Sequence, residues 1–261
     1  MLVKQIETYE ELSALASAQL RRGVKTNTIV TKEAYGAAVD QHRLRVYSEP
    51  DSLLLLQKRD GHTRMNFFLN TLADLQEPLP ADTVTEIAYR PRDIGLQEAV
   101  DYWQRQGFVL LFERMRFSRP AGMAAIDSPI PVRKPAEAEL ETVLQFLQQN
   151  FPALTGCIPM EEELAEDIHN GRILLTEDAD GITGLMHFSF DGKIGEIRHL
   201  AIREDMRGKG GTIPLLAAYL REIGEKKSVV WVRADYTAAQ KAYERFGFTA
   251  DGRRSAVLYF H

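Results

Sequence analysis

The stretch Met206-Arg-Gly-Lys-Gly-Gly-Thr212 is the most informative segment of this chain. It lies between an apolar strand that ends at Ile202 and an amphipathic helix that begins near Ile213. Glycines let backbone N–H groups turn inward, and the start of a helix adds unsatisfied N–H donors and the positive end of its dipole. Arg207 and Lys209 add positive charge. The stretch therefore predicts a phosphate-binding loop, with an ordinary glycine-rich turn as the alternative.

A second segment lies downstream of this loop. Ser228–Asp235 is strand-like and is followed by the run Ala239-Gln-Lys-Ala-Tyr-Glu-Arg-Phe-Gly-Phe248, while Glu196–Ile202 precedes the loop. In this order, the two segments resemble the two signatures of the GNAT N-acetyltransferase superfamily. The resemblance implies an α/β (α+β) fold, with a mixed, mostly antiparallel sheet flanked by helices. It also implies acetyl-CoA as a co-substrate.

The chain departs from the family pattern at two places. Thr212 stands where the family usually has Gly or Ala, and its hydroxyl can help to hold a phosphate or its bulk can crowd one. The second signature commonly opens with Asn, whereas this chain offers Asp235 or Tyr236, depending on the alignment. The alternative is therefore a non-catalytic, acyl-CoA-binding regulatory protein of the same fold.

The resemblance also implies where the cofactor binds. Backbone N–H groups at the end of the central strand are expected to hold the thioester carbonyl and the pantetheine arm, and the loop is expected to hold the pyrophosphate. The expected cofactor-binding residues are Leu200, Ala201, Ile202, Arg207, Gly208, Lys209, Gly210, Gly211 and Thr212.

Transfer of an acetyl group to a primary amine in a ternary complex needs a proton acceptor and a proton donor. Glu196 is the expected acceptor, because family members place a general base on this strand and burial raises a carboxyl pKa toward neutrality. His199 is the rival, although strict strand alternation points it to the opposite face unless a bulge intervenes. Tyr243 is the expected donor to the thiolate. For Glu196 and Tyr243 the alternatives are a solvated strand-end carboxylate and an aromatic ring that only packs on the sheet.

Hydrophobic periodicity outlines the elements of the C-terminal half. Asp180-Gly181 and Asp191-Gly192 are hairpin signals between strands. Acidic side chains at 161–167 either shape an acceptor pocket or form a solvated helix face. The expected elements are a strand at Pro131–Pro135, helices at Ala136–Phe151 and Met160–Asn170, and strands at Arg172–Glu177, Gly181–Phe190 and Lys193–Ile202.

The N-terminal half shows a fainter copy of the second signature. Val84–Tyr89 is strand-like, Leu96–Gln106 predicts a helix that ends at Gly107-Phe108, and Val109–Phe112 predicts the strand that follows. Aligning Gly107-Phe108 on Gly247-Phe248 sets Trp103 opposite Tyr243. Upstream, Arg64–Asp74 contains no glycine, so this half is expected to have lost the cofactor. The pattern predicts a duplication: a degenerate GNAT-like domain at 1–118 and an acyl-CoA-binding catalytic domain at 127–261, joined by Ser118–Pro129. The alternative is that a helix ending in Gly before an apolar strand arises often by itself, without duplication.

Composition narrows the remaining possibilities. The 261 residues are 44% hydrophobic and 26% charged, with a net charge of −5, which is ordinary for a soluble protein and disfavours nucleic acid as a partner. An aminoacyl-tRNA-dependent transferase is disfavoured for the same reason.

No long apolar segment is present, so a cytoplasmic location is expected and a membrane partner is not. Cys157 is the only cysteine, and the six histidines lack ligand spacing, so no metal is expected. The sequence does not identify the amine, which is expected to be a small molecule or a peptide.

Overall fold

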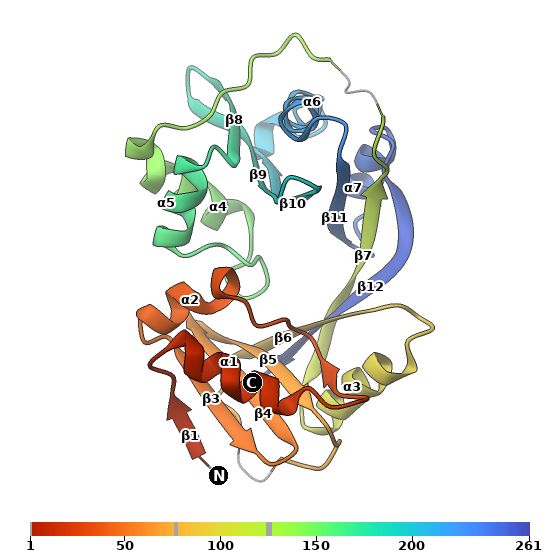
Figure 1. Ribbon diagram of the computed structural model, residues 1–261. Helices are drawn as coiled ribbons and strands as arrows, with labels where there is room; N and C mark the ends of the chain where they lie inside the picture. The colour runs from red at the N-terminus through yellow and green to blue at the C-terminus, as the bar shows by residue number, and fades with distance from the viewer. Residues whose placement is uncertain (1, 76–77, 124–126) are drawn as a thin grey trace. The chain divides into compact units, whose positions relative to one another are not determined.

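The computed structural model describes residues 2–75, 78–123 and 127–261, and it divides into two compact units (Figure 1). One unit comprises Met1–Arg114 with Gly252–His261, and the other comprises Met115–Asp251. The sequence placed Gly252–His261 in the C-terminal half, whereas these residues form strand contacts in the first unit. Part of the expected linker, at 124–126, lies outside the described residues.

The second unit carries a mixed sheet with helices on both faces (Figure 1). Its strand order is β7-β11-β10-β9-β8, in which β8, β9 and β10 are antiparallel neighbours and β10 is parallel to β11. The predicted mixed, mostly antiparallel sheet is thus confirmed. The elements are α4 (Leu140–Asn150), α5 (Glu161–His169), β8 (Ile173–Asp178), β9 (Gly181–Phe190), β10 (Ile194–Ile202), α6 (Thr212–Ile223), β11 (Lys227–Arg233), α7 (Thr237–Glu244), β7 (Val109–Arg119) and β12 (Thr249–Phe260), with β7 and β12 shared between the units.

The hairpins form where turn chemistry predicts them. Gly181 and Gly192 have φ values of 110° and 82°, which side chains with a Cβ rarely adopt. Asp191 also accepts hydrogen bonds on Oδ1 from the N–H groups of Lys193 and Ile194, at 2.8 and 2.7 Å. These local bonds fix the register of β9 against β10, which carries the site described below.

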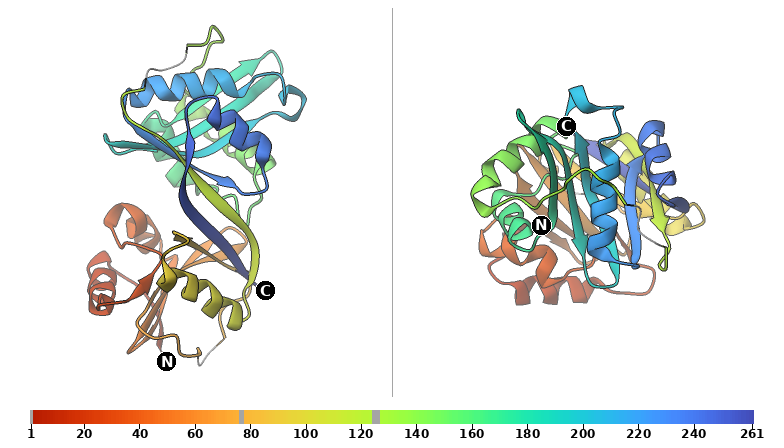
Figure 2. Two further views of the ribbon diagram at one scale, coloured as in Figure 1. Left: turned by 90° about the vertical axis from the view of Figure 1, so that its right-hand side faces the viewer. Right: turned by 90° about the horizontal axis from the view of Figure 1, so that it is seen from above.

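Two apolar layers cover the two faces of this sheet. On one face, α6 packs against β8, β9 and β10 (Figures 1 and 2). The buried side chains of α6 include Leu215, Leu216 and Tyr219. On the other face, α4 and α5 cover the alternate side chains of the same strands, with Leu147 and Leu164 fully buried. Period-2 alternation on the strands explains why successive residues join different layers.

Two sequence expectations for strands need correction. Pro131–Pro135 does not form a strand, because only Arg133 makes a bridge, to Leu175 of β8. Proline lacks an N–H donor, and the two prolines of this segment prevent a longer ladder. The strand expected at 109–112 extends to Arg119, so the first residues of the expected linker belong to β7.

The first unit repeats much of this pattern. Its strand order is β1-β3-β4-β5-β6-β12, and β5 and β6 form a parallel pair like β10 and β11. Its elements are β1 (Leu2–Gln5), α1 (Tyr9–Gln19), β2 (Lys25–Thr26), α2 (Lys32–Asp40), β3 (Leu44–Glu49), β4 (Ser52–Arg59), β5 (His62–Leu69), β6 (Thr83–Tyr89) and α3 (Ile94–Arg105).

The helix ends of the two units have the same capping geometry. Gly107 and Gly247 are both left-handed, with φ values of 95° and 79°. The following Phe donates its N–H to Trp103 O in the first unit, at 3.0 Å, and to Tyr243 O in the second, at 3.2 Å. This is the six-to-one bond of a Schellman cap. Trp103 and Tyr243 therefore occupy equivalent places, as the sequence predicted.

The first unit differs from the second between its parallel strands. The described residues between β5 and β6 contain no helix, whereas α6 stands between β10 and β11. Instead, β2 pairs antiparallel with Phe68 and Leu69 at the end of β5, on the side where β6 pairs only with residues 63–65. Asn27 then accepts from Phe67 N and donates to Glu86 O, which joins the two strands. The chain's own backbone thus fills the edge of β5 that the equivalent strand of the second unit leaves open.

Candidate functional site

The parallel strands of the second unit pair along only part of their length. The register joins Ile194–Ile197 of β10 to Lys227–Val230 of β11 and stops there. Beyond that point, β10 continues to Ile202 paired only with β9. One edge of β10 therefore presents backbone groups that no strand in the described part of the chain covers, and this edge runs directly into the glycine loop.

A bulge stands where the two strands separate. The register of β10 against β9 shifts between Ile197 and His199. Ile197 packs in the α6 layer, yet Leu200 also packs there, which strict alternation over three positions would forbid. The bulge therefore reverses the parity of the strand. Glu196 and His199 lie on the same face of β10, the one covered by α4 and α5, contrary to the expectation from strict alternation.

The backbone N–H groups of Leu200, Ala201 and Ile202, which the sequence predicted as cofactor donors, do not all point to the same edge of β10. Arg203 N donates to Thr183 O of β9 at 2.8 Å, so the antiparallel pattern directs the Ala201 N–H to β9 as well. The N–H groups of Leu200 and Ile202 alternate with these and point to the open edge. Of the three residues, Leu200 and Ile202 retain donors for a ligand, and Ala201 does not.

The glycine loop has the backbone form that the sequence predicted. Gly208 and Gly210 have φ values of 77° and 83°, Gly211 caps the helix, and α6 begins at Thr212. The N–H groups of Gly208, Gly210, Gly211 and Thr212 donate no hydrogen bond to other described residues. Such converging donors at a helix start suit an anion.

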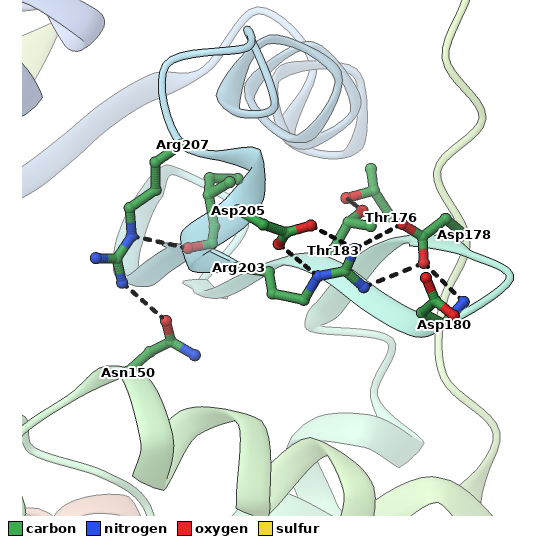
Figure 3. A network of polar contacts seen from close by, with 9 residues as sticks. Asn150, Thr176, Asp178, Asp180, Thr183, Arg203, Asp205 and Arg207 are labelled. Carbon is green, nitrogen blue, oxygen red and sulfur yellow. Dashed lines mark hydrogen bonds and ion pairs between the residues drawn. The ribbon is translucent and has the colours of Figure 1, made fainter.

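The two cations of the loop differ in their surroundings. The Arg207 side chain turns back, and its Nε donates to Ile202 O at 3.2 Å while a second nitrogen lies 3.4 Å from Asn150 Oδ1 (Figure 3). The Lys209 side chain is exposed. Arg207 therefore supports the corner between β10 and the loop in this structure, whereas Lys209 is placed to reach a phosphate.

An ion-pair network fixes the turn that precedes the loop (Figure 3). Arg203 binds Asp205 and Asp178, with nitrogen–oxygen distances of 2.7 Å to each. The hydrogen bonds that Arg203 donates to Asp205 and Asp178 raise the pKa of the Arg203 guanidinium and lower the pKa values of both carboxyls. Because these groups are solvent-accessible, the network acts mainly by orienting the turn.

Tyr243 lies in the α6 layer of the sheet. It is 6% exposed, contacts the Phe248 ring edge-on at 5.5 Å between centroids, and its hydroxyl makes no hydrogen bond with other described residues. Burial raises the pKa of the Tyr243 phenol, which keeps its proton in place at neutral pH. A protonated phenol without a protein partner can donate to a ligand.

A buried chain of polar side chains was not foreseen from the sequence. Asp167 Oδ2 lies 2.8 Å from His187 Nε2, and His187 Nδ1 lies 3.0 Å from His199 Nδ1. His199 Nε2 in turn lies 2.7 Å from Gly156 O. All three residues are buried, with Asp167 6%, His187 0% and His199 3% exposed. The sequence signal was a histidine in the middle of each of two adjacent strands, but only the pairing of the strands brings them together.

No group of acidic, histidine or cysteine side chains suited to a metal ion occurs among the described residues. Among these residues there is likewise no helix long and apolar enough to cross a membrane.

The chain is similar to known acetyltransferases in part of its sequence and to solved structures in its fold. Residues 147–257 match the family model described as Acetyltransferase (GNAT) domain. This part of the chain is therefore similar to a GNAT domain. A segment of 58 residues is also 45% identical to mycothiol acetyltransferase from Corynebacterium aurimucosum, covering 21% of this chain and 19% of that protein. The match thus spans a small part of that relative's length.

Solved GNAT structures resemble the chain over most of its length. The tandem GNAT protein from the clavulanic acid biosynthesis pathway has a TM-score of 0.60 at 11% identity, with 98% of each chain covered. A GCN5-related N-acetyltransferase from Sphaerobacter thermophilus has 0.58 at 14%, covering 92% of this chain and 96% of its own. A GNAT-family acetyltransferase from Colwellia psychrerythraea has 0.58 at 13%, with both chains fully covered. These likenesses show the fold over both units, and the duplicated architecture is shared with a tandem protein.

Proposed function

We propose that the second unit is an N-acetyltransferase that moves an acetyl group from acetyl-CoA to a primary amine. The observation that carries this proposal is the open edge of β10, which ends in a loop of unpaired N–H groups. An extended pantetheine arm can pair with the donors of Leu200 and Ile202, and the pyrophosphate fits the loop at Gly208–Thr212. The residues therefore suit coenzyme A.

The proposed chemistry uses two side chains on β10 and α7. The amine nitrogen attacks the thioester carbonyl, Glu196 takes a proton from the amine directly or through water, and the carbon–sulfur bond breaks. Tyr243 then gives its proton to the departing thiolate. His199 is not the base in this proposal, because both of its ring nitrogens are engaged, by His187 and by Gly156 O.

The acceptor is proposed to be a small-molecule or peptide amine that binds beside α4 and α5, on the face of β10 that carries Glu196. A panel of amines, each incubated with acetyl-CoA and assayed for free thiol, tests the reaction. A non-catalytic acyl-CoA-binding protein remains the second candidate, since Arg207 contacts the protein itself. Binding of acetyl-CoA by thermal shift without thiol release from any amine would favour that candidate.

The first unit is proposed to bind no cofactor. Its sequence between the parallel strands contains no glycine, the described residues there form no helix, and β2 with Asn27 occupies the corresponding edge of β5. Calorimetry of the whole chain should therefore give one coenzyme A per chain, and a stoichiometry of two would contradict this assignment.

We predict that Gly210→Ala weakens coenzyme A binding by about tenfold or more, because an Ala side chain strains a φ of 83° and moves the loop donors. Isothermal titration with coenzyme A measures this. The matched control is Gly192→Ala, which imposes the same strain at φ 82° in a hairpin turn with open space around it. Equal affinities of the two variants would argue against a binding role for the loop.

We also predict that Tyr243→Phe lowers kcat about tenfold to a hundredfold, because the thiolate then leaves without its donor. Stability should change little, since the hydroxyl has no protein partner to lose. Tyr219→Phe is the control in the same layer, where the lost hydroxyl bonds Ser228 at 2.6 Å. It should lower stability and leave turnover near normal. A Tyr243→Phe protein as active as the parent at every pH would rule out the donor role.

A further inference from the structure

The hydrogen-bonded chain from Asp167 to Gly156 joins four separate elements of the second unit. Asp167 comes from α5, His187 from β9, His199 from β10 just after its bulge, and Gly156 from the segment between α4 and α5. The Phe151 ring also packs edge-on against His199, with 4.8 Å between centroids. The His199 imidazole therefore contacts the segment Phe151–Met160 at both Phe151 and Gly156 and helps to hold it against the bulge.

The three hydrogen bonds that link Asp167, His187, His199 and Gly156 need a definite number of protons. Gly156 offers only a carbonyl oxygen, so His199 must carry a proton on Nε2. One of the two facing Nδ1 atoms must carry a second proton, and the contact between Asp167 and His187 needs a third. A carboxylate and two neutral imidazoles supply only two protons. The three bonds thus require one proton more than a carboxylate and two neutral imidazoles carry. With that proton, Asp167, His187 and His199 together have a net charge of zero.

The surroundings decide where the extra proton lies. Burial lowers the pKa of the His187 imidazole more than Asp167 raises it. Burial raises the pKa of the Asp167 carboxyl, but the hydrogen bond from His187 and the pair with Arg172 outweigh it and lower that pKa. The positive charge of Arg198 also lowers the pKa values of both Asp167 and His187. A neutral His187 that donates from Nε2 to an ionised Asp167 must accept at Nδ1, which leaves the third proton on His199.

We propose that Asp167 and His187 are positioning residues that keep His199 as an imidazolium, which holds Phe151–Met160 against the β10 bulge beside Glu196. The inference deepens the proposed function, since it assigns His199 an electrostatic part in the same site. A positive charge on the face that carries Glu196 favours the ionised carboxylate, so it keeps the proposed base ready to accept a proton at lower pH.

The protonation state can be tested directly on the whole chain without any substrate. In the protein labelled with ¹⁵N-histidine, both ring nitrogens of His199 should be protonated at neutral pH, and His187 should have one bare nitrogen. Signals are assigned with the His199→Gln and His187→Gln variants. If His199 shows one bare nitrogen, the proposal is wrong. Because this measurement needs no turnover, it stands or falls independently of the acetyltransferase proposal.

Asp167→Asn separates charge from geometry. The amide can donate to His187 Nε2 and accept from Arg172, so the contacts persist while two neutral imidazoles then satisfy every bond. His199 should become neutral, and the acid limb of kcat/KM should move up by about one pH unit as Glu196 loses its cationic neighbour. Acetyl-CoA affinity should stay within about twofold. Glu166→Gln, on the exposed side of the same helix, is the control and should change neither readout. An Asp167→Asn protein with a charged His199 or an unmoved acid limb would overturn the proposal.

Discussion

Glu196→Gln is expected to lower kcat by about 10²–10⁴-fold, because the amide keeps the shape of the side chain and loses only its basicity. The affinity for acetyl-CoA should hardly change, since Glu196 lies on the face of β10 away from α6 and its glycine loop. Steady-state kinetics with an accepted amine, together with calorimetry for coenzyme A, separate the two effects.

The control for this change is Glu225→Gln, which removes a carboxylate at an exposed position and should leave kcat as it is. The pH profile adds a second criterion. If Glu196 is the base, the acid limb of kcat/KM should disappear in Glu196→Gln. If Glu196→Gln kept the parent's kcat at saturating substrates, a water chain and not Glu196 would accept the proton from the amine. His199 could not take this role, because both of its ring nitrogens are engaged.

Trp103→Ala is expected to destabilise the first unit by about 3–5 kcal/mol, because it removes the largest fully buried side chain among the described residues. The Trp103 ring contacts Phe67, Tyr102 and Phe108, with centroid distances of 5.4, 4.9 and 5.3 Å. Its Nε1 has no hydrogen-bond partner among the described residues. The side chain therefore contributes packing alone.

Chemical denaturation measures the loss, and the fraction that remains folded should keep near-normal acetyl-CoA binding and turnover. Trp103→Phe is the matched variant: it retains an aromatic ring, removes an unpaired N–H, and should cost less stability than Trp103→Ala. A stably folded Trp103→Phe protein without activity would show that the first unit takes part in catalysis, contrary to the division of labour proposed between the units.

Local chemistry explains why much of the second unit could be predicted. The glycine loop, the Asp-Gly hairpins and the Gly-Phe helix ends require particular φ values and short-range hydrogen bonds, and these depend on residues a few positions apart. Apolar periodicity gave the helices and most strands for the same reason. The correspondence of Trp103 with Tyr243 followed from such a local signal, and the two helix ends have the same cap geometry.

The sequence by itself therefore determined the GNAT-like sheet, the position of the loop and the repeat. The bulge after Ile197, the pairing of His187 with His199, and the filling of the β5 edge by β2 were decided only by the tertiary structure. Each depends on which strands pair and in which register, and pairing partners far apart in the chain leave no local pattern. A one-residue shift at the bulge reverses the face of every later side chain, so alternation alone misplaced His199 relative to Glu196.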